Sequence, residues 1–244
     1  MNLDQISGGI YGMYLAEVAL MGSSKITRDF EIMMESLLEN QGFSQKDLLT
    51  RYLEWVQDDP TFLDENIKGA LNNHPVEDPD YACIMPLTRM FPLIIYYGTE
   101  EPHMSELISV VCQTTHRQSK CIEGCQKWYQ TLLLVLQETP FELELNEQDP
   151  FAEELSLIYR AFGISLERGD RTGYQEGLSY LLRHLRDPLR RWKNQLVLLY
   201  GQLAGTYWGV TGLDERDLFS LPKRKYLSNL IEQITSVSTE PSPH

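Results

Sequence analysis

Basic residues are scarce in this sequence of 244 residues, which has 21 Lys and Arg against 35 Asp and Glu. The formal net charge of −14 gives a surface that repels nucleic-acid phosphates and anionic lipid headgroups. We therefore expect a protein that binds neither nucleic acid nor a membrane by general charge attraction. A local basic patch remains compatible with the binding of an anion.

Cysteines and long apolar runs are also few. Four cysteines do not suggest a disulfide framework and are usual in a reducing compartment. The longest apolar stretches, such as residues 196–210, are too short and too interrupted by Gly and Gln to cross a bilayer. The first 22 residues contain Asp4 and Glu17 and have no leading Lys or Arg, unlike a signal peptide. We expect a soluble, cytoplasmic protein.

Strand patterns are nearly absent as well, and residues 141–147 (FELELNE) come closest to an apolar–polar alternation. Helical spacing is found instead. In residues 25–42, KITRDFEIMMESLLENQG, apolar side chains recur at steps of three and four residues: Phe30, Met33, Met34, Leu37 and Leu38. Gly42 suits the left-handed residue that closes a helix. This stretch is predicted to be an amphipathic helix.

Similar patterns predict helices along most of the chain. A second stripe starts near Ser44 and ends at the Asp-Asp-Pro of residues 58–60, and Pro92 is expected to kink or break a later helix. The other predicted helices cover 62–71, 84–98, 104–116, 119–138, 150–162, 172–186, 189–209 and 222–236. We predict one all-α domain of nine to twelve helices over residues 1–237, followed by a disordered tail at 238–244.

Four segments, in order, carry a resemblance to a known family. They are GGIYGMYLAEVALMG (8–22), ITRDFEIMMESLLENQGFSQKDLLTRYLEWV (26–56), LTRMFPLIIYYG with ISVVCQTTH (87–98 and 108–116), and LVLLYGQLAGTYWGVTGLDERDL (196–218). These segments resemble, in turn, the opening helix, the Thr-Asp-Asp-Thr helix, the Met-Arg-x-x-Pro-Leu and Thr-His segments, and the late Gly-x-x-x-Gly helix of the ADP-ribosylglycohydrolase family. That family includes the dinitrogenase-reductase-activating glycohydrolases. The resemblance implies a compact all-α fold.

The resemblance also implies a binuclear magnesium or manganese site that cleaves ADP-ribose from its acceptor, with ligands from the Thr-Asp-Asp-Thr and a late Asp-x-Asp-Thr. The matching positions here are Thr27, Arg28, Asp29 and Phe30, and Trp192, Lys193, Asn194 and Gln195. Most of the carboxylates are missing, and Arg28 and Lys193 add positive charges that repel a divalent metal. We therefore expect no metal cofactor and no catalytic residues.

Two further departures from the family pattern agree with this reading. Ala16 and Glu17 stand where the family has Gly-Asp, and residues 83–86 (CIMP) replace a glycine-rich loop that lets the backbone approach a ribose. The Gly-Asp-Arg-Thr at 169–172 resembles the late motif but comes too early in the chain. We interpret it as a turn and helix cap.

Seven residues are candidates to line the former ligand cleft: Glu17, Arg28, Asp29, Arg89, His116, Arg191 and Lys193. Each also has a structural interpretation. Asp29 is a favourable carboxylate at a helix start, and Glu17 could pair with Arg28. For Arg89 we favour an ion pair between helices, and His116 either lines the cleft or bonds to backbone.

A basic run at 183–193, RHLRDPLRRWK, stands out in this acidic chain. A solvated helix face is the usual interpretation. Alternatively, Arg191 and Lys193 join Arg28 in supplying the positive charge that the metals once supplied. The cleft would then hold a phosphate, a nucleotide or an acidic peptide without metal.

The spacing C-x3-H-x4-C-x3-C places four potential zinc ligands together in the sequence: Cys112, His116, Cys121 and Cys125. The spacing is not that of a common zinc motif. The Thr-His of the family explains His116, and Cys is an ordinary small core residue. We favour core packing over zinc.

The sequence thus favours a catalytically degenerate member of the family. It would act by binding, most readily a protein partner, or else an anionic or nucleotide ligand in the former cleft. The alternative is a hydrolase with residual or altered activity that removes ADP-ribose from a protein or a small molecule. A metal-free nucleotide sensor is the third hypothesis.

Overall fold

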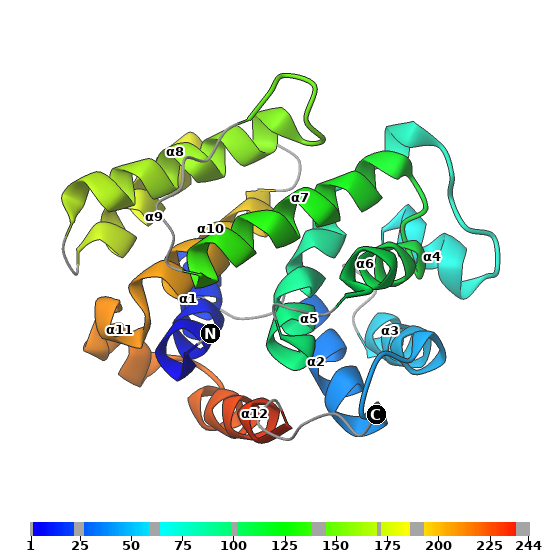
Figure 1. Cartoon of the computed structure of the whole chain (residues 1–244), viewed down its shortest axis with the longest axis horizontal. Helices are drawn as coiled ribbons and strands as arrows, with labels where there is room; N and C mark the ends of the chain where they lie inside the picture. Colours follow the sequence, from blue (N-terminus) through cyan, green and yellow to red (C-terminus); the bar gives the residue numbers. More distant parts are fainter. Residues whose placement is uncertain are drawn as a thin grey trace.

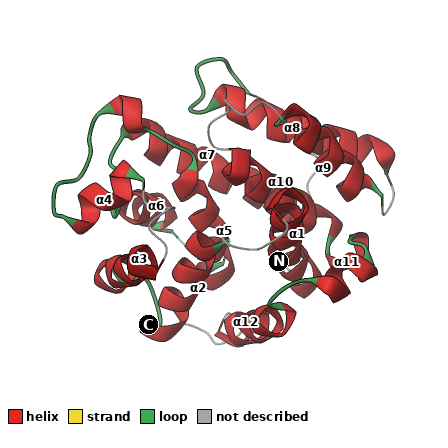
Figure 2. Cartoon of the chain, turned by 180° about the vertical axis from the view of Figure 1, so that it is seen from behind, coloured by secondary structure: helices red, strands yellow, loops and turns green. Residues whose placement is uncertain are grey.

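The computed structural model describes residues 2–21, 27–58, 64–98, 102–137, 145–169, 172–185 and 193–237. Within these ranges the chain forms twelve α-helices, three short 3-10 helices and no strand, so the predicted all-α class is confirmed (Figures 1 and 2). The elements are α1 (Leu3–Met21), α2 (Arg28–Asn40), α3 (Gln45–Asp58), α4 (Glu65–Leu71), η2 (Pro79–Tyr81), η3 (Met85–Arg89), α5 (Met90–Tyr97), α6 (Met104–Gln113), α7 (Ser119–Leu136), α8 (Ala152–Arg168), α9 (Gly173–His184), α10 (Lys193–Trp208), η4 (Val210–Gly212), α11 (Glu215–Ser220) and α12 (Arg224–Val237).

The first helix and the late helix of the chain, α1 and α10, pack along each other at the centre of the structure. Glycines line the contact on both sides: Gly8 and Gly12 on α1 meet Gly201 and Gly205 on α10. A β-carbon added to Gly205 would lie 2.2 Å from the carbonyl oxygen of Gly8. The two backbones are therefore in direct contact, as expected when small residues recur every fourth position.

The remaining helices pack around this pair. The α8–α9 hairpin covers one side of α10, and α7 crosses α10 and contacts α5 and η3 (Figure 1). On the other side, α2 packs against η3, α5 and α3, while α12 contacts α1 and α5. Large side chains fill the space between these layers, among them the fully buried Trp128, Tyr14, Tyr52, Phe30, Phe91 and Phe162. The segment before α5 is thereby held between α2, α7 and α10.

Several local predictions need correction. The left-handed residue that closes helix α2 is Gln41 (φ 53°), and not Gly42 as predicted. Gly42 follows it, and its N–H donates to the carbonyl oxygen of Leu37 at 3.0 Å. Pro92 does not break its helix, because it lies in the first turn of α5, where a missing N–H costs little. Helix α11 was not predicted.

Other predictions fall partly or wholly outside the described residues. In the strand candidate 141–147, residues 141–144 are not described, and residues 145–147 form no strand. The tail at 238–244 lies outside the described ranges, so its disorder stays a prediction. No helix in the described ranges is both long and apolar enough to cross a membrane.

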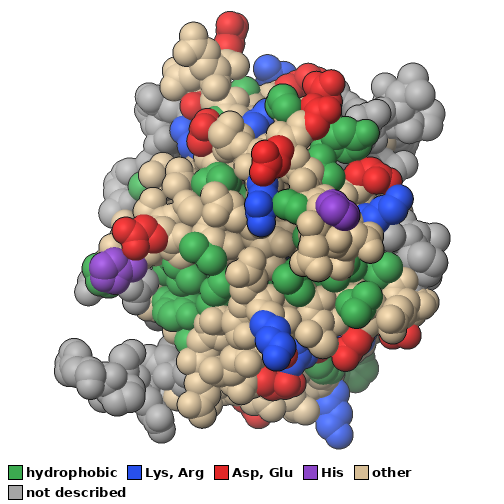
Figure 3. Space-filling view, turned by 90° about the vertical axis from the view of Figure 1, so that its right-hand side faces the viewer, with side chains coloured by type: hydrophobic (Ala, Val, Ile, Leu, Met, Phe, Trp, Pro, Cys, Tyr) green, Lys and Arg blue, Asp and Glu red, His purple; other side chains and the backbone are tan. Residues whose placement is uncertain are grey.

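One face of the molecule shows how its charges are distributed. On this face, Lys and Arg side chains of the described residues are scattered among Asp and Glu and do not gather into a broad basic patch (Figure 3). A strongly acidic chain with interspersed charges has this appearance.

Replacing Gly205 by Ala should destabilise the fold, because the new methyl group would collide with backbone and force the two central helices apart. We expect the free energy of unfolding to fall by about 1–3 kcal/mol or more. Gly163 is a matched control, because no atom lies within 4 Å of a β-carbon built there. Gly163→Ala should instead raise the stability by about 0.5–1 kcal/mol. Urea unfolding measures both, and a Gly205→Ala variant as stable as the wild type would contradict the close contact.

Candidate functional site

Asp29, in the first turn of α2, lies in a buried ion pair with Arg89 at the end of η3. The Nε atom of Arg89 is 3.1 and 3.3 Å from the two carboxylate oxygens, and the two side chains are 0% and 2% exposed. The Thr88 hydroxyl donates to Oδ2 at 2.6 Å, and the Tyr52 hydroxyl of α3 donates to Oδ1. Both oxygens of Asp29 are therefore occupied by donors, and α2, α3 and η3 are joined through one carboxylate.

Arg89 is fully buried and has further partners. Its guanidinium lies 4.9 Å from the centre of the Tyr52 ring, and Nη1 donates to the Thr115 hydroxyl at 2.8 Å. Burial alone would lower the pKa of Arg89, but the charge of Asp29 holds it above its ordinary value. Nη2 has no hydrogen-bond partner within the described part of the chain. Arg89 therefore forms the predicted ion pair between helices, and its partner is Asp29 of α2.

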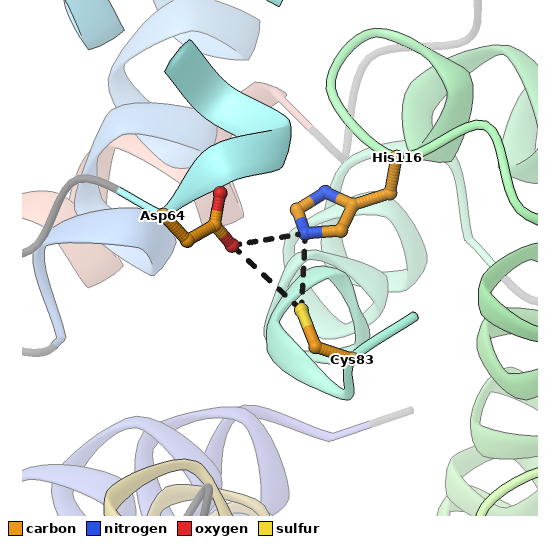
Figure 4. A group of neighbouring side chains, drawn as sticks. All are labelled: Asp64, Cys83 and His116. Carbon is orange, nitrogen blue, oxygen red and sulfur yellow. Dashed lines mark hydrogen bonds and ion pairs between the residues drawn. The ribbon is translucent and has the colours of Figure 1, made fainter. Parts of the chain in front are cut away.

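The hydrogen bonds continue from Thr115 to the ring of His116. The Thr115 hydroxyl is 2.7 Å from Nδ1, and Nε2 lies 3.3 Å from Oδ2 of Asp64 and 3.1 Å from Sγ of Cys83. Figure 4 shows the carboxylate, thiol and imidazole pointing toward one another. We call Asp29, Arg89, Thr115 and His116 the buried polar chain. It ends at the Asp64–Cys83–His116 cluster.

The cluster does not have the geometry of a Cys-His-Asp nucleophilic triad. In such a triad, the thiol and the carboxylate bind opposite nitrogens of the imidazole. Here both approach Nε2, while Nδ1 faces Thr115. Burial and the charge of Asp64 raise the pKa of Cys83, which keeps the thiol protonated. Nucleophilic catalysis by Cys83 is therefore disfavoured.

Arg28 faces a different part of the structure from Asp29, because adjacent positions on a helix point in different directions. Its Nη1 atom lies 3.1 Å from Glu31 and 2.9 Å from Glu35. The predicted pairing of Arg28 with Glu17 is wrong, since Glu17 accepts a hydrogen bond from the backbone N–H of Thr27 at 3.3 Å. The charge of Arg28 is thus balanced near α12 and is not added to the charge of Arg89.

Glu31 is the centre of this second group of charges. It is only 2% exposed, and it binds Lys223 at 2.7 Å and the Tyr14 hydroxyl at 2.5 Å in addition to Arg28. Burial alone would raise the pKa of Glu31, but hydrogen bonds from Lys223 and Tyr14 and the charge of Lys223 hold it below its ordinary value. Glu31 therefore stabilises the contact between α1, α2 and the start of α12 while it is ionised.

The other predicted site residues are placed as follows. Glu17, Asp29, Arg89 and His116 are all buried, so none of them lines an open cleft. Thr27 is also buried, and its hydroxyl has no partner among the described residues. Trp192, Arg191 and the Lys193 side chain lie outside the described part of the chain, while Asn194 and Gln195 are partly exposed at the start of α10.

The four residues of the C-x3-H-x4-C-x3-C pattern do not meet at one centre. Helix α6 ends at Gln113, so His116 leaves the face that Cys112 occupies. The thiol of Cys112 contacts the backbone oxygen of His116 at 3.4 Å, and that of Cys121 contacts the backbone oxygen of Cys83 at 3.4 Å. The ring of His116 instead meets Asp64 and Cys83, which the sequence pattern did not indicate. Asp64 and Cys83 lie 19 residues apart, so no local spacing could have revealed the cluster.

Comparison with known proteins agrees with this fold. The family model of the ADP-ribosylglycohydrolases matches residues 5–194. The chain therefore belongs to the ADP-ribosylglycohydrolase family. A solved structure described as an "ADP-ribosylglycohydrolase-related protein complex" is similar to the chain with a TM-score of 0.74 and 20% identity, over 97% of this chain and 99% of that one. No curated protein matches the chain.

The buried pair should show strong energetic coupling. Asp29→Asn and Arg89→Met each leave one charge buried without its partner, which should cost about 3–5 kcal/mol. The double variant should lose less than the sum, by about 1 kcal/mol or more. Urea unfolding at neutral pH measures the free energy of unfolding of the wild type, the two single variants and the double variant. Strictly additive losses of this free energy would argue against the pairing. Arg28→Met is the matched control, because that side chain is 33% exposed and its removal should cost about 1 kcal/mol or less.

Acid should weaken the contact that Glu31 makes. Because the pKa of Glu31 is lower in the folded protein than the ordinary value of about 4.3, its contribution is present above that value and is lost as pH falls through the folded pKa. Glu31→Gln should therefore be less stable than the wild type at pH 7, and the difference should shrink below about pH 4.3. Thermal unfolding across this range measures the difference. A gap that stays constant with pH would contradict the assignment.

Proposed function

We propose that this chain is a catalytically inactive member of the ADP-ribosylglycohydrolase family that acts by binding. The supporting observation is the buried Asp29–Arg89 pair, because both oxygens of Asp29 already accept hydrogen bonds. A divalent metal at these oxygens would have to displace Arg89 and leave its guanidinium buried without a counter-charge. Such a rearrangement costs several kcal/mol, which opposes metal binding.

The residues at the family's metal positions do not fit two magnesium or manganese ions. Hard cations need clustered oxygen ligands, chiefly carboxylates. Asp29 is the one carboxylate among the positions that match the two motifs. The other side-chain oxygens at these positions are neutral: the buried hydroxyl of Thr27 and the amide oxygens of Asn194 and Gln195. Neutral hydroxyl and amide oxygens do not supply the negative charge of the missing carboxylates, so we propose no metal-dependent step.

A protein partner is the class of ligand that we propose. Four of the residues expected to line the cleft, Glu17, Asp29, Arg89 and His116, are buried, which favours recognition through the outer surface. The chain carries a formal net charge of −14, which favours a partner with a basic face. The similar solved structure is itself described as a protein complex, which is consistent with this proposal. An ADP-ribose-like or phosphate ligand is the second candidate, carried by the basic run at 183–193.

The hydrolase alternative predicts a different result in an activity assay. With excess Mg²⁺ or Mn²⁺ and an ADP-ribosylated protein as substrate, we expect no release of ADP-ribose above the rate without protein. A catalytically active family member is the positive control. Metal-dependent release that Asp29→Asn abolishes and Arg28→Met retains would overturn the proposal.

A nucleotide ligand and a protein partner can be distinguished by experiment. Calorimetry with ADP-ribose in EDTA should give no heat at millimolar ligand if the partner is a protein. Heat that is lost when Arg191 and Lys193 are both replaced by Ala would instead favour the nucleotide ligand.

Purification from the native source under low salt should give a stoichiometric complex that dissociates at high salt, because exposed charge pairs are screened. A chain that is monomeric and alone under these conditions would argue against the partner.

A further inference from the structure

Three side chains from separate segments converge at one end of the buried polar chain. Asp64 precedes α4, Cys83 precedes η3, and His116 follows α6. Their ligand atoms Oδ2, Sγ and Nε2 lie within 4.8 Å of one another, and Figure 4 shows them facing a common point. We propose that the Asp64–Cys83–His116 cluster is a zinc-binding site. This proposal does not depend on the proposed function, because it concerns other residues and another metal.

The distances match those around a tetrahedral zinc ion. Zinc binds nitrogen and oxygen at about 2.0 Å and thiolate sulfur at about 2.3 Å, which places neighbouring ligand atoms about 3.3–3.6 Å apart. In the cluster, Nε2 is 3.1 Å from Sγ and 3.3 Å from Oδ2, and Sγ is 3.8 Å from Oδ2. Shifts of a few tenths of an ångström would bring all three atoms to bonding distance of one ion.

The chemistry of the three ligands selects the kind of metal. A thiolate and an imidazole are suited to zinc and are poor ligands for magnesium, calcium or manganese. When Cys83 is deprotonated, its charge and that of Asp64 neutralise a divalent ion, which removes the cost of burying the separate charges. Three protein ligands leave the fourth position of a tetrahedral ion for water or another small ligand.

Each ligand is oriented by a contact through another of its atoms. Nδ1 of His116 faces the Thr115 hydroxyl at 2.7 Å, which directs Nε2 toward the cluster. Oδ1 of Asp64 caps α4 by accepting from the Ile67 N–H at 2.7 Å, which leaves Oδ2 free to face His116. Outer contacts of this kind fix the geometry of zinc ligands in proteins. They are present here before any metal binds.

Access for a metal is provided by Asp64. Its side chain is 18% exposed, whereas that of His116 is fully buried. The positive charge nearest along the buried polar chain is that of Arg89, and Asp29 balances it. A cation at the cluster is therefore not opposed by an unpaired arginine.

The ring nitrogen of His116 that carries the proton differs between the metal-free and the zinc-bound forms. For the form without zinc we assign the proton to Nε2, which then donates to Asp64 while Nδ1 accepts from Thr115. With zinc, Nε2 binds the metal and Nδ1 carries the proton, which it donates to Thr115. The two forms can be told apart by the nitrogen chemical shifts of His116.

The test uses the full-length protein, stripped with a chelator and then exposed to one equivalent of Zn²⁺ or Co²⁺. After gel filtration we expect one zinc per chain by elemental analysis. The cobalt form should show a thiolate-to-cobalt charge-transfer band together with tetrahedral visible bands. Zinc retention below a tenth of an ion per chain, or a cobalt spectrum without the thiolate band in a folded wild-type protein, would overturn the proposal.

Variants assign the site to its ligands. Cys83→Ser and Asp64→Asn should each weaken zinc binding by about tenfold or more. Cys125→Ala is the matched control, because this buried thiol lies outside the cluster, and it should keep the wild-type affinity and cobalt spectrum. Equal zinc binding in all three variants would mean adventitious metal and would overturn the assignment. The circular dichroism spectrum of each variant checks folding, and the wild-type cobalt spectrum decides the question if a variant does not fold.

Discussion

The ion pair between Asp29 and Arg89 is the interaction on which the polar interior depends. Neither charge is exposed to water, so each is tolerable only beside the other. The pair joins α2 and α3 to the 3-10 helix before α5, and Thr115 extends it to His116. The carboxylate that the family would offer to a metal is here part of the core.

The sequence predicted the helices better than it predicted the interior contacts. Apolar spacing predicted α2, because burial of a stripe is a local requirement. Helix α11 was missed because six residues are too few to show a period. The pairing of Arg28 was wrong because position in a motif does not give the direction of a side chain.

The candidate site shows the same limit. Asp29 and Arg89 were each identified from the sequence, but they lie 60 residues apart, and only the folded chain makes them partners. Cys83 and His116 are separated by 33 residues and belong to no common motif. The buried polar chain connects these two places. A chain of hydrogen bonds thus links Asp29, which matches a position of the family's first metal motif, to the proposed zinc site, and both depend on the placement of η3.

Manganese binding to the wild-type protein tests the central account most directly. Crystals grown with excess Mn²⁺ and measured at the manganese absorption edge would locate any bound ion by its anomalous scattering. The account predicts no manganese beside Asp29 and an intact contact between Asp29 and Arg89. A pair of manganese ions bound to Asp29, with Arg89 displaced, would contradict it.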